Sequence, residues 1–166
     1  MKIPSLPAVA LMLSCASLTL GAQQATATSQ GTVLFVCEHG TVRSLLAKVL
    51  FEQYAKEVGL NMLAVSRGTS VDSAVPAFML QGLKADHVTL GSWRPQTLGP
   101  SDLADASYVV SFDVPLAATA TANVPRAQWD ALPPVSQNYA VGRDAIKMRV
   151  HELVDSLKRA KSAARP

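Results

Sequence analysis

The sequence predicts an α/β fold in which a parallel β-sheet is covered by helices on both faces. The main observation is that short apolar, β-rich runs alternate with longer amphipathic stretches from Thr32 onward. In such chains each helix carries the backbone from one parallel strand to the next. The second observation is size, because 166 residues with 49% apolar side chains suffice for one domain with a substantial core.

The first strand is followed by a tight loop and a helix. Residues 32–36 form a short apolar run, and apolar side chains in residues 44–58 then fall on one helical stripe. Glu52 and Lys56 form a favourable pair one turn apart, and Gly59 is placed to end the helix. The stripe consists of Leu46, Val49, Leu50, Tyr54 and Val58.

The same alternation continues with varied lengths through the rest of the chain. Pro76 suits the first turn of a helix, and the final helix has apolar residues on one face and basic residues outside it. We expect a strand at 62–65, a helix at 75–83, a strand at 107–112, a weak helix at 116–122, a strand at 127–129 and a helix at 143–160.

The first 22 residues are expected to be a secretory signal peptide. Lys2 precedes an apolar run from Leu6 to Leu20, and the small residues Gly21 and Ala22 follow. The alternatives are a membrane anchor, a buried helix, or a lipoprotein signal acylated at Cys15. We therefore expect export to the periplasm or secretion, with a signal peptide at 1–22, a flexible linker at 23–31, a folded domain at 32–160 and a basic tail at 161–166.

Composition excludes several classes of protein and draws attention to Cys37. The apolar content excludes a disordered chain, and two cysteines exclude a disulfide scaffold. A net charge of +3 with 5% aromatic residues does not suit nucleic-acid binding. If Cys15 leaves with the signal peptide, Cys37 is the one thiol of the exported protein. Such a thiol is either buried and inert or kept for chemistry.

Cys37 and Arg43 stand at the two ends of the loop between the first strand and the first helix. Ligands of parallel sheets bind where a strand runs into such a turn. Backbone N–H groups of the loop and the helix N-terminus can hold an anion, and Gly40 permits a left-handed turn. Arg43 can bind two oxygens of a tetrahedral oxyanion, while Ser44 can donate a hydrogen bond to a Cys37 thiolate. The loop is therefore a candidate phosphate cradle with a nucleophile at its base.

Residues 33–37 together with Arg43 and Ser44 resemble the low-molecular-weight protein tyrosine phosphatase family, whose fold is shared with thioredoxin-type arsenate reductases. Residues 66–69 are similar to the family's Ser-Ala-Gly-Thr, and residues 98–113 resemble the segment that leads to its Met-Asp. The resemblance extends roughly from residue 32 to residue 157. It implies a three-layer, flavodoxin-like fold with a four-stranded parallel sheet, and a phosphocysteine mechanism.

The resemblance also implies roles for the loop residues. Cys37 would attack phosphorus, Arg43 would bind the equatorial oxygens, and Ser44 would support the thiolate when it leaves in the second step. The implied activity is that of a phosphomonoesterase acting on aryl phosphates such as phosphotyrosine, and with the signal peptide we expect an exported enzyme that needs no cofactor and no metal. The remaining oxygens would be held by backbone N–H groups of Glu38, His39, Gly40, Thr41, Val42 and Arg43.

Several residues depart from the family pattern. Glu38 and His39 replace the usual apolar residue and glycine, and Gly40 stands where asparagine is usual. The charge of Glu38 matters little if its side chain points away from the loop. His39 has three interpretations: a substrate-rim contact, a second proton donor, or an exposed loop residue. Trp93 either contacts an aryl substrate or packs in the fold, and Tyr139 either lies at the rim or starts the last helix.

The general acid is the largest departure. The family uses an aspartate followed by proline near the last helix, and Pro133 takes the aspartate's position here. Asp130 is the nearest carboxylate and our first choice, although it also suits a solvent-facing turn, while Asp113 is the second choice. Loss of general-acid help costs about 10² to 10⁴ in rate. Phenols leave more readily than alkyl alcohols, so aryl phosphates would remain the best substrates.

Two other functions stay open at this point. A single-cysteine arsenate reductase-like enzyme is the nearest, because arsenate is also a tetrahedral oxyanion, yet no cysteine follows Cys37 to relay electrons. A catalytically silent oxyanion-binding or protein-interaction module is the other, prompted by Glu38, His39 and Pro133. The expected partners are a phosphorylated substrate and inorganic phosphate or another oxyanion, with no nucleic acid and no stable membrane insertion.

Overall fold

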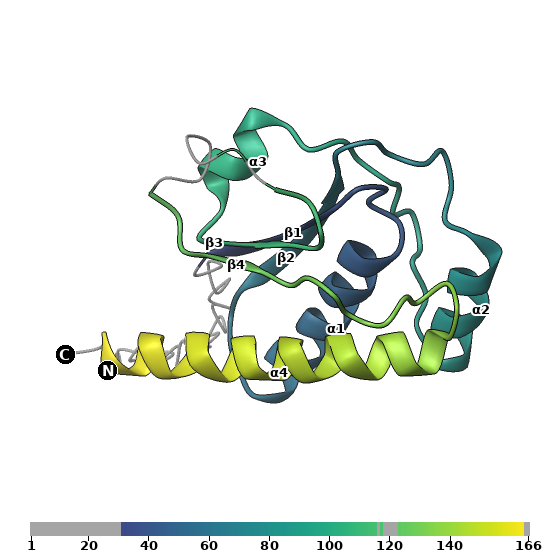
Figure 1. Cartoon of the computed structure of the whole chain (residues 1–166). Coiled ribbons are helices and arrows are strands. Elements are labelled where there is room, and N and C mark those ends of the chain that lie inside the picture. Colours follow the sequence, from purple (N-terminus) through teal and green to yellow (C-terminus); the bar gives the residue numbers. More distant parts are fainter. Residues whose placement is uncertain (1–30, 116, 118–122, 165–166) are drawn as a thin grey trace, which may run out of the picture.

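A four-stranded parallel sheet lies at the centre of the fold (Figure 1), which we describe from a computed structural model for residues 31–115, 117 and 123–164. The order of the strands in the sheet is β2-β1-β3-β4, and every neighbouring pair is parallel. The predicted α/β class and four-stranded sheet are therefore confirmed. The strands are β1 (Thr32–Cys37), β2 (Leu63–Gly68), β3 (Tyr108–Ser111) and β4 (Arg126–Gln128).

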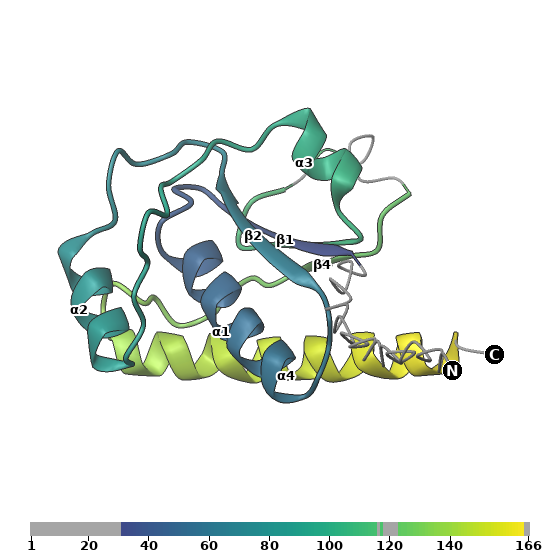
Figure 2. The ribbon, with the colours of Figure 1, turned by 180° about the vertical axis from the view of Figure 1, so that it is seen from behind.

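Helices cover both faces of this sheet, as the alternating pattern predicted. Figure 2 shows α1 and α4 side by side beneath the sheet, with α2 at one end of α4 and α3 on the opposite face. Alternate strand residues point to the two faces, so Phe35 packs in the core with α1 and α4, while Leu34 packs toward α3. The helices are α1 (Arg43–Glu57), α2 (Ala77–Ala85), α3 (Pro100–Asp105) and α4 (Tyr139–Ala163).

Some elements differ from the expectation. Helix α3 was not predicted, because six residues are too few to show an apolar stripe; Pro100 and a hydrogen bond from the Gly99 N–H to Asp102 (2.8 Å) start it. Helix α4 begins before residue 143, because Asn138 caps it by accepting from the Val141 N–H, and it extends into the expected tail. A helix was expected at 116–122, but of these residues the structure describes only 117. The N-terminal segment 1–30 also lies outside the described residues.

The described part of the chain contains the helices α1 to α4. None of these helices is both long enough and apolar enough to cross a bilayer.

One buried hydroxyl in β2 leads to a stability prediction. Ser66 is 1% exposed, and its Oγ has no hydrogen-bond partner among the described residues. An unsatisfied buried hydroxyl is unfavourable, so we expect Ser66→Ala to raise the free energy of unfolding by about 1 kcal/mol. Denaturant titration measures this change. Ser44→Ala is the control, because the buried Ser44 hydroxyl contacts Cys37 and its removal should not stabilise the fold. A clear loss of stability in Ser66→Ala would contradict the prediction.

Candidate active site

The carboxyl ends of three neighbouring strands meet at one edge of the sheet. Cys37 ends β1, while Asp113 and Asp130 follow shortly after β3 and β4. The chain places β2 on one side of β1 and β3 on the other, so β1 lies at the switch point where ligands bind in open parallel sheets. The fold therefore brings both predicted carboxylates to the same edge as the cysteine.

Cys37 lies at the base of the loop and is 5% exposed. Its Sγ is 3.1 Å from the Oγ of Ser44 and accepts a hydrogen bond from the Gly40 N–H at 3.2 Å. Helix α1 begins at Arg43, so the positive end of its dipole lies at the loop. The Cys37 sulfur is thus in contact with one backbone donor of the loop and with one hydroxyl of the helix that follows.

The loop between β1 and α1 is shaped by the segment that follows β2. Three loop carbonyls accept hydrogen bonds of 2.8 to 3.3 Å from it: Cys37 from Thr69, Glu38 from Ser70 and His39 from Asp72. In a trans peptide the N–H points away from the preceding carbonyl, and all described peptide bonds are trans. The N–H groups of Glu38, His39 and Gly40 therefore face the other, concave side of the loop, in agreement with the bond from Gly40 to Cys37.

Two glycines let the loop lie directly on the end of β2. Gly40 has a φ of +71°, which glycine adopts without a Cβ penalty. A Cβ at Gly68 would stand 2.7 Å from the Gly40 nitrogen and 2.9 Å from the Glu38 carbonyl oxygen. Backbone therefore packs on backbone here, which gives a physical reason for glycine in the motif at 66–69.

Arg43 is paired with Asp113 across the mouth of the loop. The guanidinium Nη1 donates to Oδ2 of Asp113, whose other oxygen accepts from the Ala131 N–H at 3.2 Å. Burial is the largest influence and raises the pKa of Asp113, but the hydrogen bonds from Arg43 and Ala131 outweigh it and hold that pKa below its ordinary value. Asp130 lies beside this pair, because its Oδ1 accepts from the Asp113 N–H (3.0 Å) and its Oδ2 from the Gln128 amide (2.8 Å).

The two unusual loop residues point outward. The side chain of Glu38 is 67% exposed and that of His39 is 51% exposed. The Nε2 of His39 lies 3.7 Å from Glu38, and its Nδ1 lies 3.3 Å from Oδ1 of Asp72. The carboxylate of Glu38 is thus directed toward solvent, as expected for a weak effect on the anion site. Sequence reasoning missed Asp72, which belongs to no motif and becomes visible only when the fold brings it to the loop.

Trp93 and Tyr139 have contacts in other parts of the fold. Trp93 packs against the core and shares a cavity with Val49 and Gln53 of α1, so the packing alternative fits its position. Tyr139 starts α4 and donates from its hydroxyl to Asp86 at 2.7 Å. Burial raises the pKa of Tyr139, and Asp86 raises it further. The cavity that Trp93 lines and the hydrogen bond of the Tyr139 hydroxyl involve no residue of the loop 37–43.

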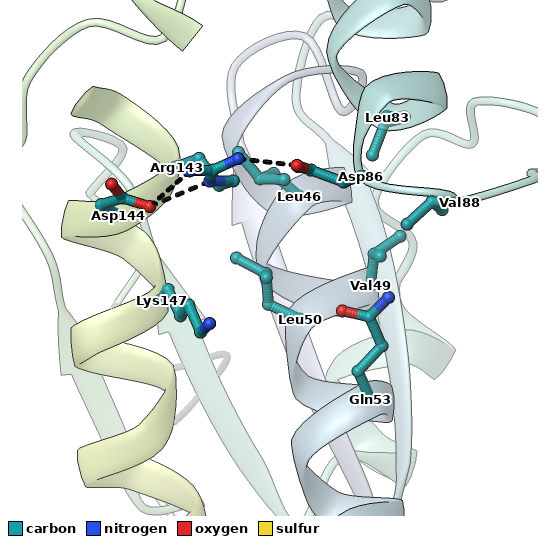
Figure 3. A pocket seen from close by; sticks show the side chains of 10 residues that line it. All are labelled: Leu46, Val49, Leu50, Gln53, Leu83, Asp86, Val88, Arg143, Asp144 and Lys147. Atoms are coloured by element: carbon teal, nitrogen blue, oxygen red, sulfur yellow. Dashed lines mark hydrogen bonds and ion pairs between the residues drawn. The ribbon is translucent and has the colours of Figure 1, made fainter. Parts of the chain in front are cut away.

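A cavity of about 310 Å³ lies elsewhere, between α1, α2 and α4 (Figure 3). Leu46 and Leu50 line its apolar part, and Asp86 pairs with Arg143 across one end. No residue of the loop 37–43 lines it. Among the described residues, no group of histidine, cysteine, aspartate and glutamate is arranged to hold a metal ion.

Solved structures share this fold at modest sequence identity. A thioredoxin-dependent arsenate reductase from Corynebacterium glutamicum is 23% identical with a TM-score of 0.65; the match covers 81% of this chain and 65% of that longer chain. An arsenate reductase from Archaeoglobus fulgidus DSM 4304 is 27% identical with a TM-score of 0.62, covering 74% and 98%. A low molecular weight phosphotyrosine phosphatase from Vibrio cholerae O395 is 19% identical with a TM-score of 0.64, covering 76% and 96%.

The family match extends over nearly all of the described residues. No curated protein sequence matches the chain significantly. The model of the family described as low molecular weight phosphotyrosine protein phosphatase matches residues 32–163, which include the cysteine loop, both carboxylates and all four strands. Together with the geometry of the loop, this match confirms the resemblance seen in the sequence. The chain belongs to the low molecular weight phosphotyrosine protein phosphatase family.

Proposed function

We propose that the protein is a phosphomonoesterase that hydrolyses aryl phosphates, including phosphotyrosine, through a phosphocysteine intermediate. The observation that carries this proposal is the position of Cys37 at the base of the loop. Its sulfur contacts the Gly40 N–H and the Ser44 Oγ, and Arg43 lies at the other end of the loop. A nucleophile below converging N–H groups and a guanidinium suits attack on a tetrahedral phosphoryl group.

The reaction would proceed in two displacements. In the first, the Cys37 thiolate forms an S–P bond while the P–O bond to the aryl group breaks, and the leaving oxygen receives the proton of an acid. In the second, water attacks phosphorus, the S–P bond breaks, and the thiolate and inorganic phosphate are released, the proton from water returning to the same carboxylate. Ser44 stabilises the thiolate at both stages, and Arg43 binds the phosphoryl oxygens throughout.

We assign the acid to Asp130 and expect Asp130→Asn to slow turnover more than Asp113→Asn. Asp113 is held ionised by Arg43, because its lowered pKa disfavours the protonated form that an acid requires. Asp130 is exposed and must exchange at least one of its two accepted hydrogen bonds before it reaches a leaving group. With phenyl phosphate, kcat should fall by about 10² in Asp130→Asn, and by less with p-nitrophenyl phosphate, whose phenol is more acidic. The reverse order of the two variants would overturn the assignment.

The proposed function is tested by assaying the purified full chain with p-nitrophenyl phosphate and phosphotyrosine. We expect turnover of both and inhibition by vanadate, which mimics the trigonal bipyramidal transition state. Phosphate binding without turnover would instead indicate a silent oxyanion-binding module. Arsenate reduction with a small thiol, in the absence of phosphate-ester hydrolysis, would indicate the arsenate reductase-like alternative.

We also propose that the chain is exported after removal of residues 1–22. Support comes from the sequence, in which a lysine and an apolar run precede small residues. Expression of the full chain in a bacterial host, followed by N-terminal sequencing of the extracytoplasmic fraction, tests the proposal. An intact N-terminus confined to the cytoplasm would contradict it.

A further inference from the structure

The loop between β1 and α1 has one side-chain brace that the proposed mechanism does not use. Thr41 lies inside the loop with 0% exposure, and its Oγ1 donates to Oδ2 of Asp72 at 2.8 Å. The backbone N–H of Asp72 donates to the His39 carbonyl at 3.3 Å, and its Oδ1 lies 3.3 Å from the His39 ring. Asp72 therefore contacts the loop at two residues through three atoms.

The bond from Thr41 to Asp72 supports the second half of the loop, which leads to Arg43. The carbonyls of Cys37 and Glu38 are already held by Thr69 and Ser70, which fixes the first half of the loop. The second half leads to Arg43, and Thr41 is its one buried polar side chain. The bond from Thr41 to Asp72 connects this half of the loop to the segment that follows β2.

We propose that Asp72 is a positioning residue, which acts through the Thr41 hydroxyl to hold the N–H groups and Arg43 in the geometry of the phosphoryl transition state. The inference rests on the proposed function, since it assigns Asp72 to the same loop. The carboxylate itself does not touch the substrate. Its effect is to limit the conformations of the loop, so that donors are in place before charge develops on the phosphoryl oxygens.

The experiment compares Asp72→Ala and Thr41→Val with the double variant in the full chain. We expect kcat for p-nitrophenyl phosphate to fall about tenfold in each single variant. It should fall no further in the double variant, because both substitutions remove the same hydrogen bond between Thr41 and Asp72. The KM should change little. Asp72→Asn keeps an acceptor for Thr41 and should restore most of the activity, as should Thr41→Ser, which keeps the hydroxyl.

Asp105→Ala is the matched control, because Asp105 is exposed and forms no hydrogen bond or ion pair with the described residues. It removes the same charge and should leave kcat unchanged. Additive losses in the double variant, or equal kcat values in Asp72→Ala and Asp105→Ala, would overturn the proposal. So would an Asp72→Ala variant that melts at a lower temperature but keeps the kcat of the wild type at 25 °C.

Binding of vanadate and of inorganic phosphate separates this inference from the proposed function. The vanadate affinity should fall about tenfold in Asp72→Ala and the phosphate affinity by less, because a positioning residue affects the transition-state mimic more than the product. If the wild type shows no turnover, the proposed function fails, while these affinities still test Asp72. Equal loss for both anions would contradict a positioning role.

Discussion

Cys37→Ser is expected to abolish phosphatase turnover while leaving the affinity for inorganic phosphate within a few-fold of the wild type. A serine hydroxyl in the same place stays un-ionised at neutral pH, so the nucleophile is lost, and removal of such a group lowers kcat by about 10⁴ or more. The loop amides and Arg43 should stay in place, because the contacts between the loop and the segment 69–72, including the bond from Thr41 to Asp72, do not involve the cysteine sulfur. Steady-state assays and isothermal titration with phosphate measure the two quantities.

This pair of measurements also distinguishes a catalyst from a binding module. Ser44→Ala is the matched control. It removes the hydroxyl that contacts the Cys37 sulfur but keeps the sulfur itself, so it should slow turnover without abolishing it. A Cys37→Ser variant that keeps more than a small fraction of the wild-type rate would show that another group carries the reaction. In that case the phosphocysteine mechanism would be wrong even though the family assignment stands.

Arg43→Lys should lower kcat/KM by about 10² to 10³, although the charge is kept. A planar guanidinium can bind two phosphoryl oxygens at once, whereas an ammonium group acts as a single point charge. Loss of one donor to a developing oxyanion has an effect of this size. The exchange also weakens the pairing with Asp113, which holds the Arg43 side chain at the mouth of the loop.

Arg149→Lys is the control for this prediction. Arg149 lies on the exposed side of α4, where it pairs only loosely with Glu152 at 3.5 Å. The same chemical change there should leave kcat/KM unaltered. If Arg43→Lys matched the control, bidentate binding would not be part of the mechanism.

The part of the site predicted best from sequence is the part made by neighbouring residues. Cys37, Gly40, Arg43 and Ser44 lie within one loop and the first turn of a helix, so the spacing along the chain already constrains their geometry. The β1-loop-α1 unit was predicted on the same local signals. In the structure the hydroxyl of Ser44 lies 3.1 Å from the cysteine sulfur, and either atom could donate the hydrogen bond.

What sequence reasoning could not supply comes from distant segments. Asp72 reaches Thr41 only because β2 lies parallel to β1 and the chain turns back over the loop after Gly68. The pairing of Thr97 with Gly68 extends the sheet edge with a segment that shows no strand pattern. Likewise, nothing in the sequence indicated that Asp113 would pair with Arg43.

The order of the strands bears on when the thiol is protected during folding. β1 and Cys37 are made early, but the segment 69–72 and the strand β3 that enclose them are made later. Parallel pairing of this kind is non-local and forms slowly compared with a helix. Until it forms, these segments do not cover Cys37, whereas in the native fold the residue is 5% exposed. Steric protection of Cys37 is therefore weakest in the newly made chain, before the segment 69–72 and β3 have packed beside β1.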